Sequence, residues 1–236
     1  MARCVTNERP NRDRATPSFS TMAGLAILIA AHVGCGHSAA TKEGKSNAAA
    51  GESTTAGSRA EPTKEHLETP VVKFETTAGN ITVRLDAVHA PGTVRNFLNY
   101  VNDHFYDNTL IHYVDPGKMI VAGGYAADGS PKHGLTPIRS EAHNGLKNAR
   151  GTIAMTRDSA AIDSAVSQFF FNLTDAPQRD HTGDTADKYG YCVFGEVTEG
   201  LDVAEKISRS PATNHGGDLA QTPDPPVVIK SVRVVP

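Results

Sequence analysis

The chain has 236 residues, of which 39% are hydrophobic and 21% are charged, and its formal net charge is −3 at pH 7. This charge balance excludes a histone-like nucleic-acid binder, because such proteins need clustered cations to bind phosphates. The apolar content excludes a chain that is disordered throughout, and no run of residues approaches the ~18–20 apolar residues of a membrane-spanning helix.

The N-terminal region has the pattern of an export signal. Residues 1–21 contain four arginines against two acidic residues, and an apolar run follows at 22–33. A basic segment followed by roughly 7–15 apolar residues is typical of a signal peptide. A short buried helix is the alternative interpretation, but the sequence around this run offers no globular segment to bury it. We therefore predict a signal peptide at residues 1–34.

The end of the apolar run, Val33-Gly34-Cys35, is similar to a bacterial lipobox, in which the cysteine is lipidated and becomes the new N-terminus. His32 departs from the pattern, because such boxes usually carry Leu there. We predict lipidation at Cys35, with the exported protein held at the bacterial cell envelope by a lipid anchor in the membrane. A single acyl chain binds a membrane weakly, so the multiple acyl groups of a lipoprotein would provide the anchoring.

Residues 36–69 contain no Phe, Tyr, Val, Ile or Met and are rich in Ala, Gly, Ser and Thr. Such a segment cannot bury enough apolar surface to offset the entropy lost on ordering. All Phe and Tyr residues except Phe19 lie at or after Phe74. We therefore predict a disordered tether at 35–69 and one folded domain at 70–236, which we expect to be a monomer.

The predicted elements of this domain are mostly short strands. Residues 71–75 and 81–85 are rich in β-branched and aromatic residues, and Thr77–Asn80 between them has the Gly and Asn of a tight turn. Apolar residues recur at helical spacing over 91–101, after a proline suited to the first turn. A second short helix is predicted at 201–208. Further strands are predicted at 119–121, 152–155, 168–173, 191–197 and 227–235. Many strands with two helices indicate a β-barrel or a β-sandwich.

The sequence lacks the common motifs of metal and cofactor sites. Its ten histidines form no HxH or HExxH pattern, and there is no P-loop, GxGxxG or GxSxG motif. The Gly pair in Ala122–Tyr125 is predicted to form a tight turn rather than a phosphate site. The lone Cys192 is predicted to be a small core residue rather than a nucleophile. We expect neither a metal nor a cofactor.

Three segments resemble the signature segments of the cyclophilins, a family of peptidyl-prolyl cis-trans isomerases, and the likeness is greatest to short bacterial members. They are Glu141-Ala-His-Asn-Gly-Leu-Lys-Asn-Ala-Arg-Gly-Thr-Ile-Ala-Met155, Ser167-Gln-Phe-Phe170 and Tyr189-Gly-Tyr-Cys-Val-Phe-Gly-Glu196. Further matches at 96–98, 105–109 and 111–112 follow in the family's order. The resemblance covers about 71–235. It implies an all-β fold, an eight-stranded antiparallel barrel capped by two helices, with a surface groove that binds proline-containing polypeptides.

The resemblance also implies the reaction, which is cis–trans rotation about X–Pro bonds. In this family an arginine serves the prolyl nitrogen, a glutamine anchors the substrate, and Phe, Met and Phe form the proline pocket. Met119, Gln168 and Phe170 match binding and pocket positions directly. These three residues are therefore the predicted substrate-binding residues.

Other groove positions depart from the family pattern. Tyr113 stands at the position of the catalytic arginine, which makes it the candidate catalytic residue. Lys118 stands at a pocket phenylalanine, Val121 at a glutamine, and Gln178-Arg179 where members carry Trp or Phe followed by Leu. Tyr191 replaces the groove histidine of many members, as in short bacterial ones. A tyrosine offers one neutral donor where a guanidinium offers five and a permanent charge.

Three functional interpretations stay open at this point. The first is an exported isomerase weakened by these substitutions, in which Tyr113, Lys118 or Arg179 supplies the lost donor. The second is a non-catalytic peptide-binding module on the cell envelope, whose basic groove residues, including Arg157, would suit an acidic ligand. The third is a structural envelope lipoprotein. Measured exchange on a proline peptide would distinguish the first from the other two.

Overall fold

The computed structural model describes residues 69–236. The predicted signal peptide and lipidation site, and all but the last residue of the predicted tether, lie outside these residues.

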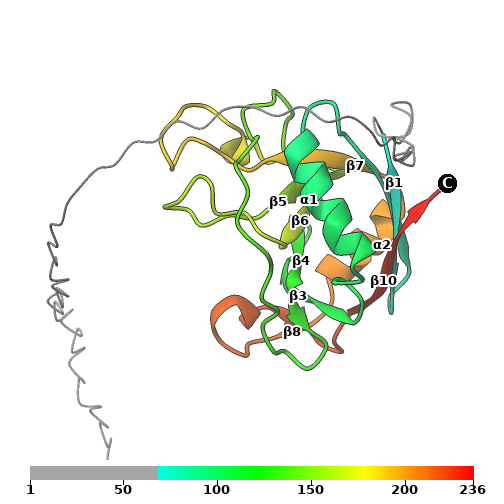
Figure 1. Cartoon of the computed structure of the whole chain (residues 1–236). Coiled ribbons are helices and arrows are strands. Elements are labelled where there is room, and N and C mark those ends of the chain that lie inside the picture. Colours follow the sequence, from blue (N-terminus) through cyan, green and yellow to red (C-terminus); the bar gives the residue numbers. More distant parts are fainter. Residues whose placement is uncertain (1–68) are drawn as a thin grey trace, which may run out of the picture. The chain divides into compact units, whose positions relative to one another are not determined.

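Eight strands form a closed barrel: β1 (Val71–Thr76), β2 (Asn80–Leu85), β3 (Thr109–Asp115), β4 (Met119–Ala126), β5 (Thr152–Met155), β6 (Phe169–Asn172), β7 (Val193–Glu199) and β10 (Val228–Val235). Every neighbouring pair is antiparallel, in the order β1-β10-β3-β4-β6-β5-β7-β2. The predicted eight-stranded barrel with two helices is therefore confirmed (Figure 1).

Two α-helices and several short elements complete the fold. They are α1 (Pro91–Asn102), α2 (Leu201–Ser208), the 3-10 turns η2 (Pro177–Arg179) and η3 (Gly217–Leu219), and the small sheet of β8 (Ala212–Thr213) and β9 (Thr222–Pro223). The helices are amphipathic, and their apolar residues join the barrel core. Within residues 69–236, neither helix has the length and apolarity needed to cross a membrane.

The core of the barrel is built mainly from aromatic rings. Phe97 of α1 lies 5.2 Å from Phe194, 5.7 Å from Phe169 and 6.1 Å from Phe74, measured between ring centroids. These side chains are almost fully buried. Because an aromatic side chain buries a large apolar area and pairs well edge to face, this cluster fixes α1 and β6 against each other. The outward-facing residues of β6 are thereby placed on a rigid support.

Two details of the sequence prediction need correction. The predicted turn at Ala122–Tyr125 is wrong, because these residues continue β4. Gly123 and Gly124 serve close packing instead: a Cβ on Gly123 would lie 2.8 Å from the carbonyl oxygen of Ser167. The strand β3 was not predicted, because four consecutive residues at its start are buried and no alternation marks them.

The long connection between β4 and β5 is fastened to α1 by one carboxylate. Ala90, which precedes α1, has no polar side chain to cap the helix. Glu141 takes this role from a distant segment, accepting hydrogen bonds from the backbone N–H groups of Gly92 (3.0 Å) and Thr93 (2.8 Å) and from the Thr93 hydroxyl (2.7 Å). An anion at a helix N-terminus satisfies free N–H groups and interacts favourably with the helix dipole.

Candidate functional site

A row of apolar side chains crosses five strands on the outer face of the barrel. Tyr113 of β3 is paired with Val121 of β4, Val121 with Phe170 of β6, Phe170 with Ala154 of β5, and Ala154 with Val193 of β7. Cross-strand partners project to the same face of a sheet. These residues form an apolar cluster separate from the barrel core. The row is the floor of the candidate site.

A groove of about 770 Å³ lies over one end of this row. Tyr113, Met119, Val121, Arg157 and Gln168 are among the residues that line it. Phe170 belongs to the same apolar cluster as Met119 and Val121, which places it at the edge of the groove. The structure thus brings together all three predicted substrate-binding residues and the predicted catalytic candidate. A concave site with an apolar floor and a few polar groups is typical of ligand binding.

The Gln168 side chain packs against the backbone of β4 at Gly124. A Cβ on Gly124 would lie 2.6 Å from both the side-chain carbon Cδ and the nitrogen Nε2 of Gln168. Only glycine at position 124 leaves this space for the amide. The backbone carbonyl of Gln168 accepts hydrogen bonds from the backbone N–H (3.0 Å) and the hydroxyl (3.2 Å) of Thr156. Gly124 is therefore a positioning residue for Gln168, which sequence reasoning missed because it interpreted this glycine as part of a turn.

Tyr113 and Lys118 differ in how they relate to the groove. Tyr113 is half-buried in the lining, and within residues 69–236 its hydroxyl makes no hydrogen bond. The side chain of Lys118 is 62% exposed, and its Nζ lies 3.3 Å from Asp115 Oδ2 in the β3–β4 turn. Tyr113 is thus free to donate into the groove, whereas Lys118 is an exposed, paired charge at its margin.

Arg179, in η2, places its guanidinium over the pocket residues. Its Cζ lies 5.4 Å from the ring centroid of Phe170, which is within cation–π range. Nη1 donates to Asn172 Oδ1 at 3.1 Å, and Nη2 lies 2.7 Å from Met119 Sδ, a weak acceptor. Tyr191 completes the surroundings, with its ring edge-on to Phe170 at 5.6 Å. The apolar surface beside the groove therefore carries two aromatic rings, a thioether and a cation.

The backbone around Arg179 is fixed by buried amides. Asn148 Nδ2 donates to the carbonyl oxygen of Arg179 at 2.9 Å, and Asn172 Nδ2 donates to Asn148 Oδ1 at 3.2 Å. Asn172 is fully buried and Asn148 is 2% exposed. Buried amides that satisfy one another specify a single arrangement. Sequence reasoning did not single out these two asparagines, because their partners lie in different segments of the chain.

Arg157 also lines the groove, but its donors are occupied. Nε donates to the carbonyl oxygen of Gly190 at 2.7 Å, Nη2 to that of Ala186 at 2.6 Å, and Nη1 to that of Asp158 at 2.8 Å. Its Cζ lies 5.2 Å from the ring centroid of Tyr191. Arg157 therefore binds the 186–190 segment to the groove wall.

His112 lies beneath the groove and was not predicted as a site residue. It is 2% exposed, and its Nδ1 is the single buried side-chain nitrogen or oxygen in residues 69–236 without a hydrogen-bond partner. Burial lowers the pKa of His112 from 6.5 to about 4, with Asp218 opposing the shift. Its ring lies 4.8 Å from that of Tyr125, which hydrogen-bonds to Asp218 (2.9 Å). A neutral imidazole therefore supports this wall at neutral pH.

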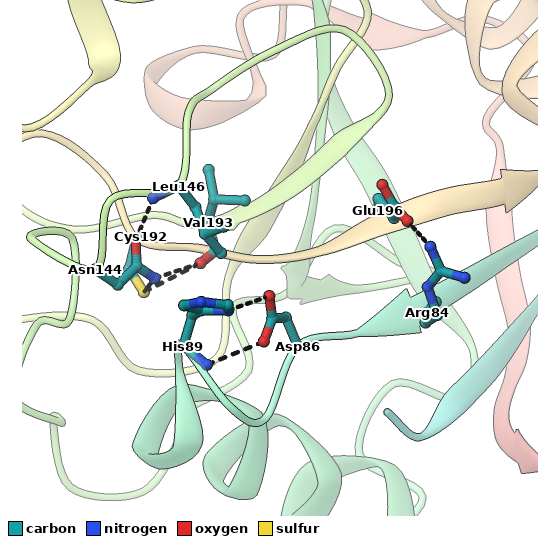
Figure 2. Close-up of polar contacts among 8 residues, drawn as sticks. All are labelled: Arg84, Asp86, His89, Asn144, Leu146, Cys192, Val193 and Glu196. Carbon is teal, nitrogen blue, oxygen red and sulfur yellow. Dashed lines mark hydrogen bonds and ion pairs between the residues drawn. The ribbon is translucent and has the colours of Figure 1, made fainter. Parts of the chain in front are cut away.

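A second hollow, of about 500 Å³, lies at the other end of the row beside β2 and β7. Two pairs of its ionisable side chains contact each other (Figure 2). Arg84 pairs with Glu196, and His89 Nδ1 lies 2.7 Å from Asp86 Oδ2.

Cys192 immediately precedes β7, where Asn144 fastens the 141–155 segment by donating to the carbonyl oxygen of Val193 at 3.0 Å (Figure 2). Cys192 is 4% exposed, and burial raises the pKa of its thiol to about 12, as expected for a core cysteine. In the described part of the chain, no three His, Cys, Asp or Glu side chains converge as metal ligands would.

Comparisons with family models, known sequences and solved structures all find the same family. The family model of the cyclophilin type peptidyl-prolyl cis-trans isomerases matches residues 71–234. Peptidyl-prolyl cis-trans isomerase A of Dickeya dadantii is 44% identical over 164 residues, which cover 70% of this chain and 84% of that protein. Isomerase B of Escherichia coli is 43% identical over 164 residues, covering 70% and 99%. The crystal structure of a cyclophilin type isomerase from Cryptosporidium parvum superposes with a TM-score of 0.60 at 23% identity, covering 71% and 98%.

Proposed function

The chain belongs to the cyclophilin-type peptidyl-prolyl cis-trans isomerases, and from this premise we propose that it rotates X–Pro bonds in protein substrates at a reduced rate. The observation that carries the proposal is the groove, which Met119 and Gln168 line with Phe170 at its edge, while Tyr113 stands where the family resemblance places arginine. A C. parvum relative was crystallised in the presence of the dipeptide Ala-Pro, which supports a proline-containing ligand.

The reaction needs no covalent intermediate. Twisting an X–Pro bond costs ~20 kcal/mol because amide resonance is lost, and a catalyst must bind the twisted form more tightly than the planar ones. Phe170 and Met119 supply an apolar surface for the proline ring. Gln168, whose amide packs against Gly124, hydrogen-bonds the peptide backbone. The Tyr113 hydroxyl provides one neutral donor toward the prolyl nitrogen as that nitrogen becomes pyramidal.

The reduced rate follows from the hydrogen-bond donors that the groove offers to the twisted X–Pro bond. Replacing the main transition-state donor typically costs ~10²–10³ in rate. Val121 is 7% exposed and has no polar side-chain atom to hold the substrate. We therefore expect catalysis above the uncatalysed exchange but far below that of a relative with the arginine.

The test measures exchange between the cis and trans forms of the X–Pro bond in a short Ala-Pro peptide, by exchange spectroscopy with the purified protein. Catalysed exchange that disappears in the Phe170→Ala variant, while circular dichroism shows that the variant is folded, supports the proposal. Exchange at the uncatalysed rate, with peptide still bound, favours the non-catalytic binding module. If the protein neither accelerates exchange nor binds the peptide, the result contradicts the isomerase proposal and the binding module alike.

Export and anchoring complete the proposed function. The basic segment, the apolar run and Gly34-Cys35 support secretion with lipidation at Cys35. The Ala/Gly/Ser/Thr-rich residues 36–69 would then act as a tether between the anchor and the domain. The protein would act on polypeptides at the bacterial cell envelope.

A further inference from the structure

Four basic residues, Lys118, Lys132, Arg157 and Arg179, lie in or beside the groove and differ in whether their charge is already compensated. Lys132 donates to the backbone carbonyl oxygen of Phe105 and lies over that ring. Lys118 pairs with Asp115, and Arg157 donates to backbone carbonyls. Arg179 has neither kind of partner: its two contacts are a neutral amide oxygen and a thioether. Within residues 69–236, no carboxylate lies in ion-pair range of Arg179, and the adjacent Asp180 pairs instead with Lys147 at 3.6 Å.

The Arg179 guanidinium is also held in place before any ligand arrives. Asn172, which accepts its Nη1 hydrogen bond, is fully buried and donates in turn to Asn148 and, at 2.9 Å, to Thr152. The backbone carbonyl of Arg179 accepts from Asn148 and from the N–H of Tyr191 at 2.9 Å. A half-buried guanidinium with spare donors in a fixed position is suited to a carboxylate, which it can bind through two parallel hydrogen bonds.

We propose that Arg179 makes the groove selective for polypeptides that carry a carboxylate side chain next to the proline. This inference rests on the proposed function. The Arg179 guanidinium touches Met119 and lies over Phe170, the two residues offered to the proline ring. Consecutive residues of a peptide are ~3.8 Å apart, so the side chain beside a proline on this surface lies within reach of the guanidinium. A carboxylate there pairs with Arg179, whereas a neutral side chain leaves the cation over the aromatic ring.

The test compares peptides that differ only in charge. Ala-Glu-Pro-Phe is measured against Ala-Gln-Pro-Phe, and Ala-Ala-Pro-Glu against Ala-Ala-Pro-Gln, by exchange spectroscopy and by competition against a fluorescent proline peptide. We expect the intact protein to prefer Glu over Gln about tenfold at low ionic strength at one position or both, with less preference as salt is added. Arg179→Leu should reduce the ratio to about one, and Arg179→Lys should retain part of it.

Arg95→Leu is the matched control, because it removes one positive charge from an exposed site on α1 outside the groove. It should leave the Glu preference unchanged. Equal use of Glu and Gln peptides at both positions, or a preference that survives Arg179→Leu, overturns the inference while leaving the isomerase function intact. If no peptide is isomerised, the competition assay decides: a Glu preference lost in Arg179→Leu supports the inference without catalysis, and equal or absent binding overturns it.

Discussion

Tyr113 and Val121 face each other directly across the β3–β4 pair, on the outer side of the barrel. Two positions at which the family resemblance expects an arginine and a glutamine are therefore adjacent, and here they carry a neutral hydroxyl and an aliphatic side chain. Because neighbouring groups act together on one substrate, restoring either alone would leave the donor set incomplete. This pairing determines how the proposed reduction in rate should be tested.

We expect Tyr113→Arg, Lys118→Phe and Val121→Gln, introduced together, to raise the exchange rate on a proline peptide by ~10²-fold or more. The arginine restores a charged donor, the glutamine a substrate contact, and the phenylalanine an apolar wall. Loss of the exposed Lys118–Asp115 pair should cost little stability. A folded but inert triple variant would favour the binding module, and a wild-type rate equal to that of the E. coli relative would show that these groups matter less than we argue.

Gly124→Ala should reduce the exchange rate about tenfold and change the melting temperature little. The added Cβ displaces the Gln168 amide, which is the flexible end of a side chain and can swing away. The control is a double-mutant cycle: in the Gln168→Ala background, Gly124→Ala should have no further effect on the rate. An equal loss of rate in both backgrounds would mean that Gly124 acts on something other than Gln168.

Acid should destabilise the fold through His112. Its pKa is about 4 in the folded state against 6.5 as the ordinary value, so the unfolded state binds the extra proton between these limits. The free energy of unfolding is therefore highest above pH 6.5 and falls as the pH drops toward 4, by about 2–3 kcal/mol. Asp86 and Asp107, whose pKa values are lowered below 3.8, lose their contribution at still lower pH.

Urea unfolding of His112→Leu at several pH values tests whether His112 causes the loss of stability in acid. The variant should show a much flatter dependence between pH 6.5 and 4 than the wild type. Replacing the exposed His133 with Gln serves as the control and should leave the slope unchanged. If His112→Leu keeps the wild-type slope, other groups cause the acid sensitivity.

The mature protein should begin at Cys35 and partition with membranes. Intact-mass analysis of the native protein should show a lipid-modified cysteine at its N-terminus. Cys35→Ser should abolish the modification, whereas Cys4→Ser should not, because residue 4 lies in the predicted signal peptide. An unmodified N-terminus elsewhere, in a soluble fraction, would contradict the lipoprotein prediction.

Local sequence patterns predicted the regular elements well. The helical spacing over 91–101 predicted α1, and the alternation over 81–85 predicted β2, because each element buries one face only. The pattern failed for β3, whose first four residues are all buried. It also failed for Gly123-Gly124, where contacts from a distant strand decide the backbone.

The site was predictable only in part. Segments in the family's order predicted Met119, Gln168 and Phe170 as substrate-binding residues, and these three side chains do lie together at the groove. The position of the Arg179 guanidinium was not predictable, because it depends on Asn172, a buried amide on another segment whose own partners lie elsewhere. Local sequence signals do not specify such long-range side-chain contacts.

The pairing of β1 with β10 has a consequence for how the domain folds during synthesis. β10 inserts between β1 and β3, and Val71 at the start of the domain is the partner of Val235 (Figure 1). The barrel cannot close until nearly the whole domain has left the ribosome, so the contacts between residues far apart in the sequence form last. Folding should therefore be slower than in a protein whose contacts are mostly between residues close in sequence. A nascent chain would therefore keep the edges of β1 and β3 unpaired until β10 has been made.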